Sequence, residues 1–126
     1  MSTIKTKELS SNALDWAVST CEGYQPVYTN GSILPVFRKN KNVEDSIKNY
    51  SSNWNHGGPI IEQEKISISY NNQNEWIAKI ADHQSQGPTP LIAAMRCYVL
   101  SKLGNEIEIP QQLINQPITK FKISYK

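Results

Sequence analysis

The chain has 126 residues, and its 13 Lys and Arg against 11 Asp and Glu leave a net charge of +2. This length is typical of one domain with one hydrophobic core, so a single domain over residues 1–126 is expected. The small net charge differs from the dense basic surface that drives binding to duplex nucleic acid, which is therefore not an expected partner. The longest apolar run carries an arginine and is too short to span a membrane, so no membrane partner is expected.

The amino end and the two cysteines indicate an intracellular setting. The first residues, MSTIKTKELS, lack the apolar segment of a secretory signal peptide, so the chain is expected to be cytoplasmic. Cys21 and Cys97 each lie in a helical pattern among apolar neighbours. Because cytosolic disulfides are rare, both are expected to be free, buried thiols.

The amino-terminal part of the chain predicts an edge strand followed by a helix. The strand is expected over residues 4–9 and the helix over residues 12–22, where apolar residues recur at the spacing of one buried stripe. Gly23 is expected to end this helix. Trp16 lies off the stripe, so it is expected to pack on a second element or to line a groove.

The next segment is rich in strand-forming residues and then becomes charged. Residues 24–37 favour strands, with a hairpin turn signalled by Asn30-Gly31. Residues 38–49 are charged and Asn-rich with little periodicity, which indicates a mobile surface connection or a short exposed helix.

The middle of the chain predicts a shaped loop and a hairpin. Residues 50–59, YSSNWNHGGP, contain two glycines and a proline, which favour an irregular loop. Ile60 and Ile61 are expected to anchor the exit of this loop in the core. Residues 66–70 and 76–80 then predict two paired strands. The polar residues 81–86 are interpreted as a connection.

The most readable element is the helix within residues 87–104, GPTPLIAAMRCYVLSKLG. Thr89 is a suitable cap, Pro90 fits the first helical position and Gly104 suits the residue past the last turn. Apolar residues cover most of its surface, which predicts a central helix buried on most sides. Arg96 interrupts the apolar run, so its charge needs a partner.

The carboxy-terminal part predicts two more strands around a helical turn. Residues 106–109 alternate apolar with polar and stop at a proline, residues 111–115 favour a turn of helix, and residues 121–125 fit a last strand at a sheet edge. The complete order predicts an α+β fold, in which a small, mainly antiparallel sheet packs on the central buried helix and on a second, amphipathic helix.

Three segments resemble a known phage family. Residues 13–23 (ALDWAVSTCEG), 53–66 (NWNHGGPIIEQEKI) and 87–110 (GPTPLIAAMRCYVLSKLGNEIEIP) are similar, in order, to blocks of the NinX family of lambdoid and related bacteriophages. The family pattern often has an acidic residue before the tryptophan of the second block, whereas this chain has Asn53. The resemblance implies a phage origin and a host-cytoplasmic setting, and it brings no established activity and no catalytic residues.

The first candidate ligand site is the amino end of the central helix. Free N–H groups at a helix amino end attract anions, and Gly87 admits a close approach beside Thr89 and Leu91. Arg96 lies further along the helix and leans toward this end. The alternative is that Thr89 only caps the helix and Arg96 pairs with a core carboxylate such as Asp15 or Glu62.

The second candidate site is the predicted loop around Trp54. An exposed tryptophan flanked by Asn53 and Asn55 can stack on a flat ring while the amides bind its edge. Gly57 and Gly58 would let the backbone approach a ligand closely. The alternative is a tight turn with Trp54 buried in the core.

Catalytic and metal sites have weaker signals in the sequence. His56 and His83 do not lie at ligand spacing from a cysteine or carboxylate cluster, and neither a nucleophile elbow nor a phosphate-binding glycine motif is present. No catalytic residue, metal or cofactor is assigned, and the chain is interpreted as more consistent with a binding protein than with an enzyme.

Two functions are compatible with these patterns. The first is a phage accessory protein that binds and sequesters a nucleotide-derived small molecule, such as a host defence signal, without catalysis. The alternative is a protein-binding module that acts on a host or phage protein of replication, recombination or defence, with tryptophans as anchors. A homo-oligomer is expected. Binding of single-stranded nucleic acid is less compatible with the near-neutral charge.

Overall fold

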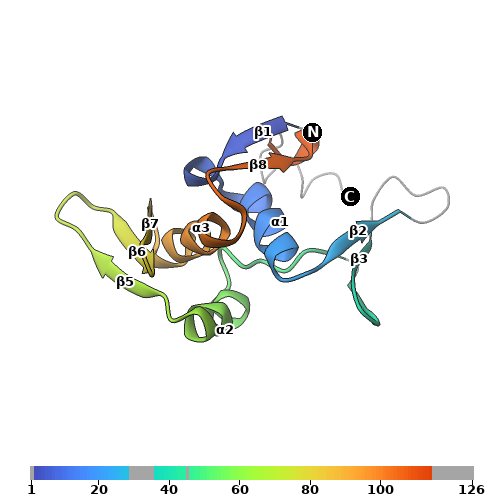
Figure 1. Cartoon of the computed structure of the whole chain (residues 1–126), viewed down its shortest axis with the longest axis horizontal. Coiled ribbons are helices and arrows are strands. Elements are labelled where there is room, and N and C mark those ends of the chain that lie inside the picture. The colour runs from blue at the N-terminus through green and yellow to red at the C-terminus, as the bar shows by residue number, and fades with distance from the viewer. Residues whose placement is uncertain (1, 29–35, 45, 115–126) are drawn as a thin grey trace, which may run out of the picture.

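Helix α3 (Pro90–Leu103) lies at the centre of the molecule (Figure 1), for which the computed structural model describes residues 2–28, 36–44 and 46–114. The Thr89 hydroxyl accepts the Ile92 amide at 3.1 Å, and Gly104 follows the last turn with a φ of +91°, a conformation that favours glycine. Its buried side chains are those of Leu91, Ala93, Ala94, Met95, Cys97, Tyr98 and Val99. The predicted capped helix, buried on most sides, is confirmed.

A three-stranded antiparallel sheet covers one side of α3. Strands β5 (Ser67–Tyr70) and β6 (Trp76–Ile80) form the predicted hairpin, and β7 (His83–Gly87) adds a third strand in the order β5-β6-β7. The interpretation of residues 81–86 as a connection is wrong. Ser85 and Gly87 face inward in β7, and such small residues carry no apolar signal although they allow α3 to pack closely.

Helix α1 (Ser11–Cys21) packs on the other side of α3, as predicted, and Gly23 follows it with a φ of +97°. Trp16 packs edge-on against Phe37, with ring centroids 5.8 Å apart, and this contact joins α1 to a second sheet. That sheet consists of β2 (Gln25–Val27), β3 (Val36–Lys39) and β4 (Asn42–Glu44).

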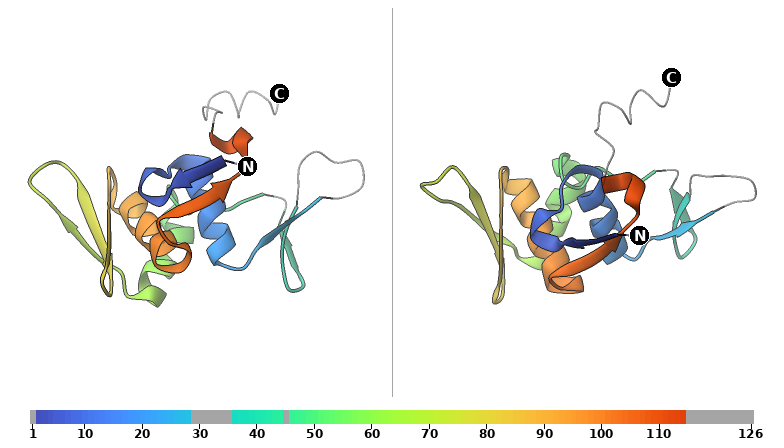
Figure 2. Two further views of the ribbon diagram at one scale, coloured as in Figure 1. Left: turned by 45° about the horizontal axis from the view of Figure 1, so that its top comes forward. Right: turned by 90° about the horizontal axis from the view of Figure 1, so that it is seen from above.

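The second sheet changes one interpretation of the sequence. Residues 38–49, expected to be a surface connection or a short helix, contain the end of β3 and the whole of β4, which pair with each other in antiparallel register. The predicted Asn30-Gly31 turn lies outside the described residues. Figure 2 shows this sheet and the β5-β6-β7 sheet at opposite ends of the molecule.

The two ends of the described chain meet in a third sheet. Strand β1 (Ser2–Lys5) pairs with β8 (Glu106–Ile109) in antiparallel register. The prediction that the first strand continues to residue 9 is wrong, because a 3-10 turn, η1 (Thr6–Glu8), follows β1. The Thr6 amide and hydroxyl donate to the carbonyls of Asn105 and Gly104, at 2.7 and 2.5 Å, and this fixes the turn. The short helix α4 (Gln111–Ile114) follows β8, and the last predicted strand lies outside the described residues.

Residues 50–59 do not form the predicted loop, because helix α2 (Trp54–Glu64) begins within them. The Asn53 side chain accepts the Asn55 amide at 2.9 Å and caps this helix. Ile60 is buried, and Ile61 packs against the core, as expected. Packing of α2 on α3 therefore outweighs the helix-breaking tendency of two glycines and Pro59.

The structure confirms the predicted α+β class with antiparallel pairing, and the strands are divided among three small sheets. The largest fully buried side chains of the common core are those of Leu9, Leu14, Met95, Ile109, Val18, Val99, Thr6 and Cys97. Both cysteines are free, with Cys97 buried and Cys21 half-buried. None of the helices in the described ranges has the length and apolar character needed to cross a membrane.

Candidate functional site

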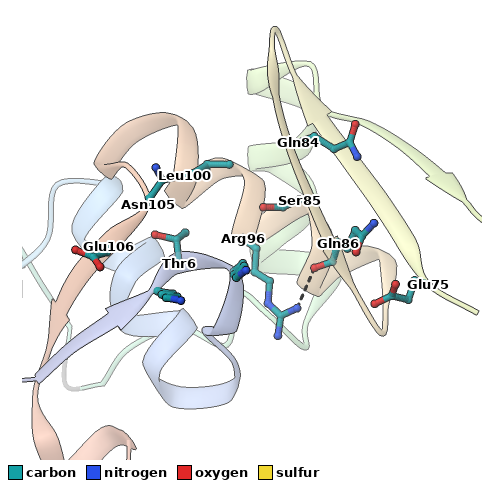
Figure 3. A pocket seen from close by; sticks show the side chains of 11 residues that line it. Thr6, Glu75, Gln84, Ser85, Gln86, Arg96, Leu100, Asn105 and Glu106 are labelled. Carbon is teal, nitrogen blue, oxygen red and sulfur yellow. Dashed lines mark hydrogen bonds between the residues drawn. The ribbon is translucent and has the colours of Figure 1, made fainter.

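An open groove of about 820 Å³ lies between strand β7 and the region where β1, η1 and β8 meet, with α3 beneath it (Figure 3). Arg96 lies in the middle of this groove, with Gln84, Ser85, Gln86 and Glu75 to one side of it in the close view. The lining residues are Lys5, Thr6, Lys7, Glu75, Gln84, Ser85, Gln86, Arg96, Leu100, Asn105 and Glu106. We call this the Arg96 groove.

Arg96 is held in the groove by backbone carbonyls. Its Nε donates to the carbonyl of Leu9 at 2.7 Å, and its Nη1 donates to the carbonyl of Gln86 at 2.9 Å. The alternative of a pairing with a core carboxylate such as Asp15 or Glu62 is wrong, because neither forms an ion pair with Arg96 and Asp15 instead accepts the amide of Ser51 at 2.8 Å. Among the described residues, Arg96 forms no ion pair.

The half-buried guanidinium therefore has fixed geometry and a charge that the protein balances only weakly. Burial lowers the pKa of Arg96, and to a smaller extent the negative charge of Glu75 raises it. Both effects leave the guanidinium protonated at neutral pH, because an arginine pKa lies far above 7. The N–H groups that do not bind the two carbonyls are available to an anion from outside the protein.

The rest of the lining is polar and of mixed charge. Lys5 and Lys7 add two cations, whereas Glu75 and Glu106 add two carboxylates. Lys5 lies directly opposite Glu106 in the pairing of β1 with β8. Lys7, in η1, has no such opposite partner, so Lys7 and Arg96 make the groove attractive to an anion.

Residues of the predicted Trp54 site lie on the first turn of α2. Trp54 is 53% exposed, and Asn55 is exposed beside it. Asn53 is the cap of the helix, so its side-chain oxygen already accepts a hydrogen bond from a backbone amide. Trp54 and Asn55 therefore form a surface feature separate from the Arg96 groove.

Gly57 lies where α2 packs on α3. A Cβ at this position would lie 2.6 Å from Cδ1 of Leu91 and 2.7 Å from the carbonyl oxygen of Tyr50. The structure thus brings Gly57 and Leu91 together as packing partners, and Leu91 is buried. Among the described residues, a Cβ on the half-buried Gly58 would meet only the Trp54 ring, at 4.0 Å.

Gly87 and Thr89 lie at the amino end of α3, as predicted. A Cβ on Gly87 would lie 2.7 Å from the amide nitrogen of Ala93, so the close approach at this glycine is made by α3 itself. Thr89 accepts hydrogen bonds from two backbone amides. Its hydroxyl accepts from the Ile92 amide, and its carbonyl accepts from the Ala93 amide. Most of the donors expected for an anion at this end therefore have partners within the chain.

Of the residues predicted to bind a ligand, Arg96 alone lines the groove. The other lining residues come from five separate segments of the chain, and most are ordinary polar residues of strands and turns. Their sequence carries no motif, because only the packing of β7 and η1 around α3 brings them together. Arg96 itself is detectable as the charge that interrupts the apolar run of α3, whose other charge, Lys102, lies in the last turn.

Two further ionisable clusters are structural. Tyr98 donates to Glu22 at 2.6 Å and joins the carboxy-terminal parts of α1 and α3. Burial raises the pKa of Asp15 to about 6, although its hydrogen bond from Ser51 lowers it. Within the described ranges, no group of His, Cys, Asp and Glu side chains is arranged to hold a metal ion.

Comparison with known proteins identifies the family of the chain. The family model described as "Bacteriophage P22, NinX" matches residues 5–102, a range that extends from the end of β1 nearly to the end of α3. It therefore includes Lys5, Lys7, Glu75, the groove residues of β7 and Arg96. No curated protein sequence matches the chain. The resemblance noted in the sequence is confirmed, and the chain belongs to the NinX family of bacteriophage proteins.

Proposed function

We propose that this phage protein binds a nucleotide-derived, anionic small molecule in the Arg96 groove and sequesters it without catalysis. A signalling nucleotide made by the infected host as a defence is a ligand of this class, and the host cytoplasm is the expected setting. The observation that carries the proposal is the guanidinium of Arg96, which is oriented by two carbonyls and has no ion-pair partner among the described residues.

The composition of the groove supports a ligand that is both charged and polar. Lys7 and Arg96 supply positive charge, while the exposed side chains of Gln84 and Gln86 offer amide donors and acceptors beside it. Phosphate groups and base edges use these two kinds of contact. Trp54 is not part of this proposal, because it does not line the groove.

The proposal is tested by calorimetry with cyclic dinucleotides, cyclic oligonucleotides and ADP-ribose derivatives. Lys7→Gln removes a cation from the groove and is expected to weaken binding, whereas Glu75→Gln removes a carboxylate and is expected to strengthen it. Lys41→Gln, in the turn between β3 and β4, makes the same charge change as Lys7→Gln away from the groove and is the matched control. Folded protein that binds no member of the panel would exclude the proposal.

The expected homo-oligomer remains part of the proposal. Light scattering of the protein with and without a bound member of the panel gives its mass directly. A monomeric mass in both conditions would overturn the expected homo-oligomer and would leave the proposed ligand binding unaffected.

Protein binding is the second candidate function, and one observation favours it. Trp54 is a large aromatic side chain, 53% exposed, at the start of helix α2, which packs on α3. Exposed tryptophans on rigid elements are typical anchors of protein interfaces. The partner would be a host or phage protein of replication, recombination or defence.

A further inference from the structure

Strand β7 presents its free backbone edge to the Arg96 groove. In its sheet β7 pairs with β6 on one side, and no described strand pairs with its other side. The Gln86 carbonyl accepts Nη1 of Arg96, so this carbonyl lies on the free side (Figure 3). In an antiparallel ladder the N–H and C=O of one residue take part in the same kind of pair. The Gln86 amide therefore also points away from β6, toward the groove.

The register of the hairpin leads to the same assignment. Ile80 and His83 close a two-residue turn, and a pair in this position exchanges hydrogen bonds. Hydrogen-bonded and non-hydrogen-bonded pairs alternate along the ladder, so Gln84 and Gln86 belong to the second kind. Their amides are donors roughly 7 Å apart along the edge, at about 3.4 Å per residue.

We propose that the Gln86 amide and the remaining N–H groups of Arg96 together bind a phosphate group, which makes the groove selective for phosphorylated ligands. This inference rests on the proposed function and specifies the chemical group that the groove recognises. Because Arg96 binds the carbonyl of Gln86, its guanidinium lies next to the amide of the same residue. Donors from a backbone and from a guanidinium then converge on neighbouring oxygens of one phosphate.

The neighbouring charges suit such a group. Lys7 adds a cation to the same groove, and the Gln84 amide offers a donor further along the strand. A terminal phosphate, as in a phosphomonoester or at the end of a pyrophosphate, has enough free oxygens to accept from Arg96 and Gln86 at once. An uncharged nucleoside leaves both donors without a partner, so the groove discriminates against it.

The experiment compares ADP, inorganic pyrophosphate and adenosine as probes. Calorimetry is expected to give binding at least about tenfold tighter for ADP than for adenosine, since charge-assisted hydrogen bonds are lost with the phosphates. In ¹⁵N-resolved NMR, pyrophosphate alone is expected to shift the Gln86 amide and the Nε signal of Arg96. The amide of Lys41, in the turn between β3 and β4 and away from the groove, is the internal reference.

Two substitutions at one position separate the backbone from the side chain. Gln86→Pro removes the amide and retains the carbonyl that binds Arg96, and an edge strand tolerates proline where its N–H faces outward. It is expected to weaken ADP binding by about tenfold. Gln86→Ala removes only the side chain, which lines the groove, so it is expected to weaken ADP and adenosine alike and to leave the ratio of their affinities within about twofold of the original. Circular dichroism confirms that both variants are folded.

The outcomes separate this inference from the proposed function. Equal affinities for ADP and adenosine, or an unchanged Gln86 amide signal with pyrophosphate, would overturn phosphate recognition while other nucleotide-derived ligands still bind. The NMR measurement uses the unaltered protein, so it decides the matter even if Gln86→Pro does not fold. Failure of the whole ligand panel would instead overturn the proposed function.

Discussion

The carboxylate of Asp15 accepts the backbone amide of Ser51 at 2.8 Å and thereby joins α1 to the turn that precedes α2. The side chain is almost completely buried, and this burial raises its pKa to about 6 from 3.8. Since the folded protein holds this proton more tightly than the unfolded chain, the contribution of Asp15 to stability is greatest at low pH. It declines as the pH rises from about 4 to 6.

Asp15→Asn is therefore expected to be more stable at pH 7 than the original protein, in which Asp15 is ionised, by about 1–3 kcal/mol. The asparagine side chain retains an acceptor for the Ser51 amide and carries no buried charge. Denaturant unfolding between pH 4 and 8 measures the free energy of unfolding of both proteins. Their difference is expected to increase up to about pH 6 and then to level off.

Asp82→Asn is the control for this measurement, because the Asp82 side chain is 95% exposed. It is expected to leave the pH dependence of stability nearly unchanged. A difference between Asp15→Asn and the original protein that stayed constant from pH 4 to 8 would contradict the raised pKa of Asp15.

The adjacent glycines of α2 are expected to respond in opposite directions to alanine. Gly57→Ala would place a Cβ 2.7 Å from the Tyr50 carbonyl oxygen, a backbone atom that cannot move freely, and is expected to cost about 1–3 kcal/mol. In the part of the chain that the structure describes, the Cβ of Gly58→Ala meets only the Trp54 ring, at 4.0 Å, and the variant is expected to gain about 0.5–1 kcal/mol from helix propensity. Thermal or denaturant unfolding of both variants gives the two signs.

Each variant is the control for the other, because both make the same chemical change in one helix. Equal effects of the two substitutions would show that Gly57 is not required for the contact of α2 with Leu91. Destabilisation by Gly58→Ala alone would be incompatible with the packing described for α2.

The sequence was informative where local signals agreed with the packing. Thr89 and Gly104 mark the ends of α3, and the alternation over residues 66–70 and 76–80 predicts a hairpin that the structure contains. The signals were misleading where tertiary contacts decide. Gly57 suggested a loop, yet it is needed for the close approach of α2 to α3.

The groove could be predicted only through Arg96. A charge that interrupts the apolar run of a buried helix requires a partner, and this pattern singles out Arg96 in the sequence. The partners are the carbonyls of Leu9 and Gln86, which every residue possesses and which no sequence pattern identifies. Strand β7 was missed for a similar reason, since its inner positions are Ser85 and Gly87, which are small instead of apolar.

Arg96 is also expected to contribute to stability, independently of any ligand. Its two hydrogen bonds connect α3 to the segment before α1 and to the edge of β7. A lysine ammonium cannot reproduce the planar fork that reaches both carbonyls, so Arg96→Lys is expected to cost about 1–2 kcal/mol. The free energy of unfolding without ligand measures this effect.

Arg38→Lys is the matched control, because Arg38 is exposed on β3. It is expected to change stability by less than about 0.5 kcal/mol. An equally small effect at Arg96 would show that its hydrogen bonds to Leu9 and Gln86 contribute little to the fold, and the side chain would then serve the groove alone.

Trp54 provides the test that separates protein binding from ligand binding. Because its side chain is 53% exposed, Trp54→Ala is expected to cost less than about 1 kcal/mol of stability, whereas Trp16→Ala, which removes the contact with Phe37, is expected to cost about 2–3 kcal/mol. The folded Trp54→Ala variant is then compared with the original protein in calorimetry with the nucleotide panel and in co-purification from infected cells. Loss of a co-purified partner without any change in ligand affinity would support the second candidate function. Nucleotide affinity that decreased with Trp54→Ala would contradict the separation of Trp54 from the Arg96 groove.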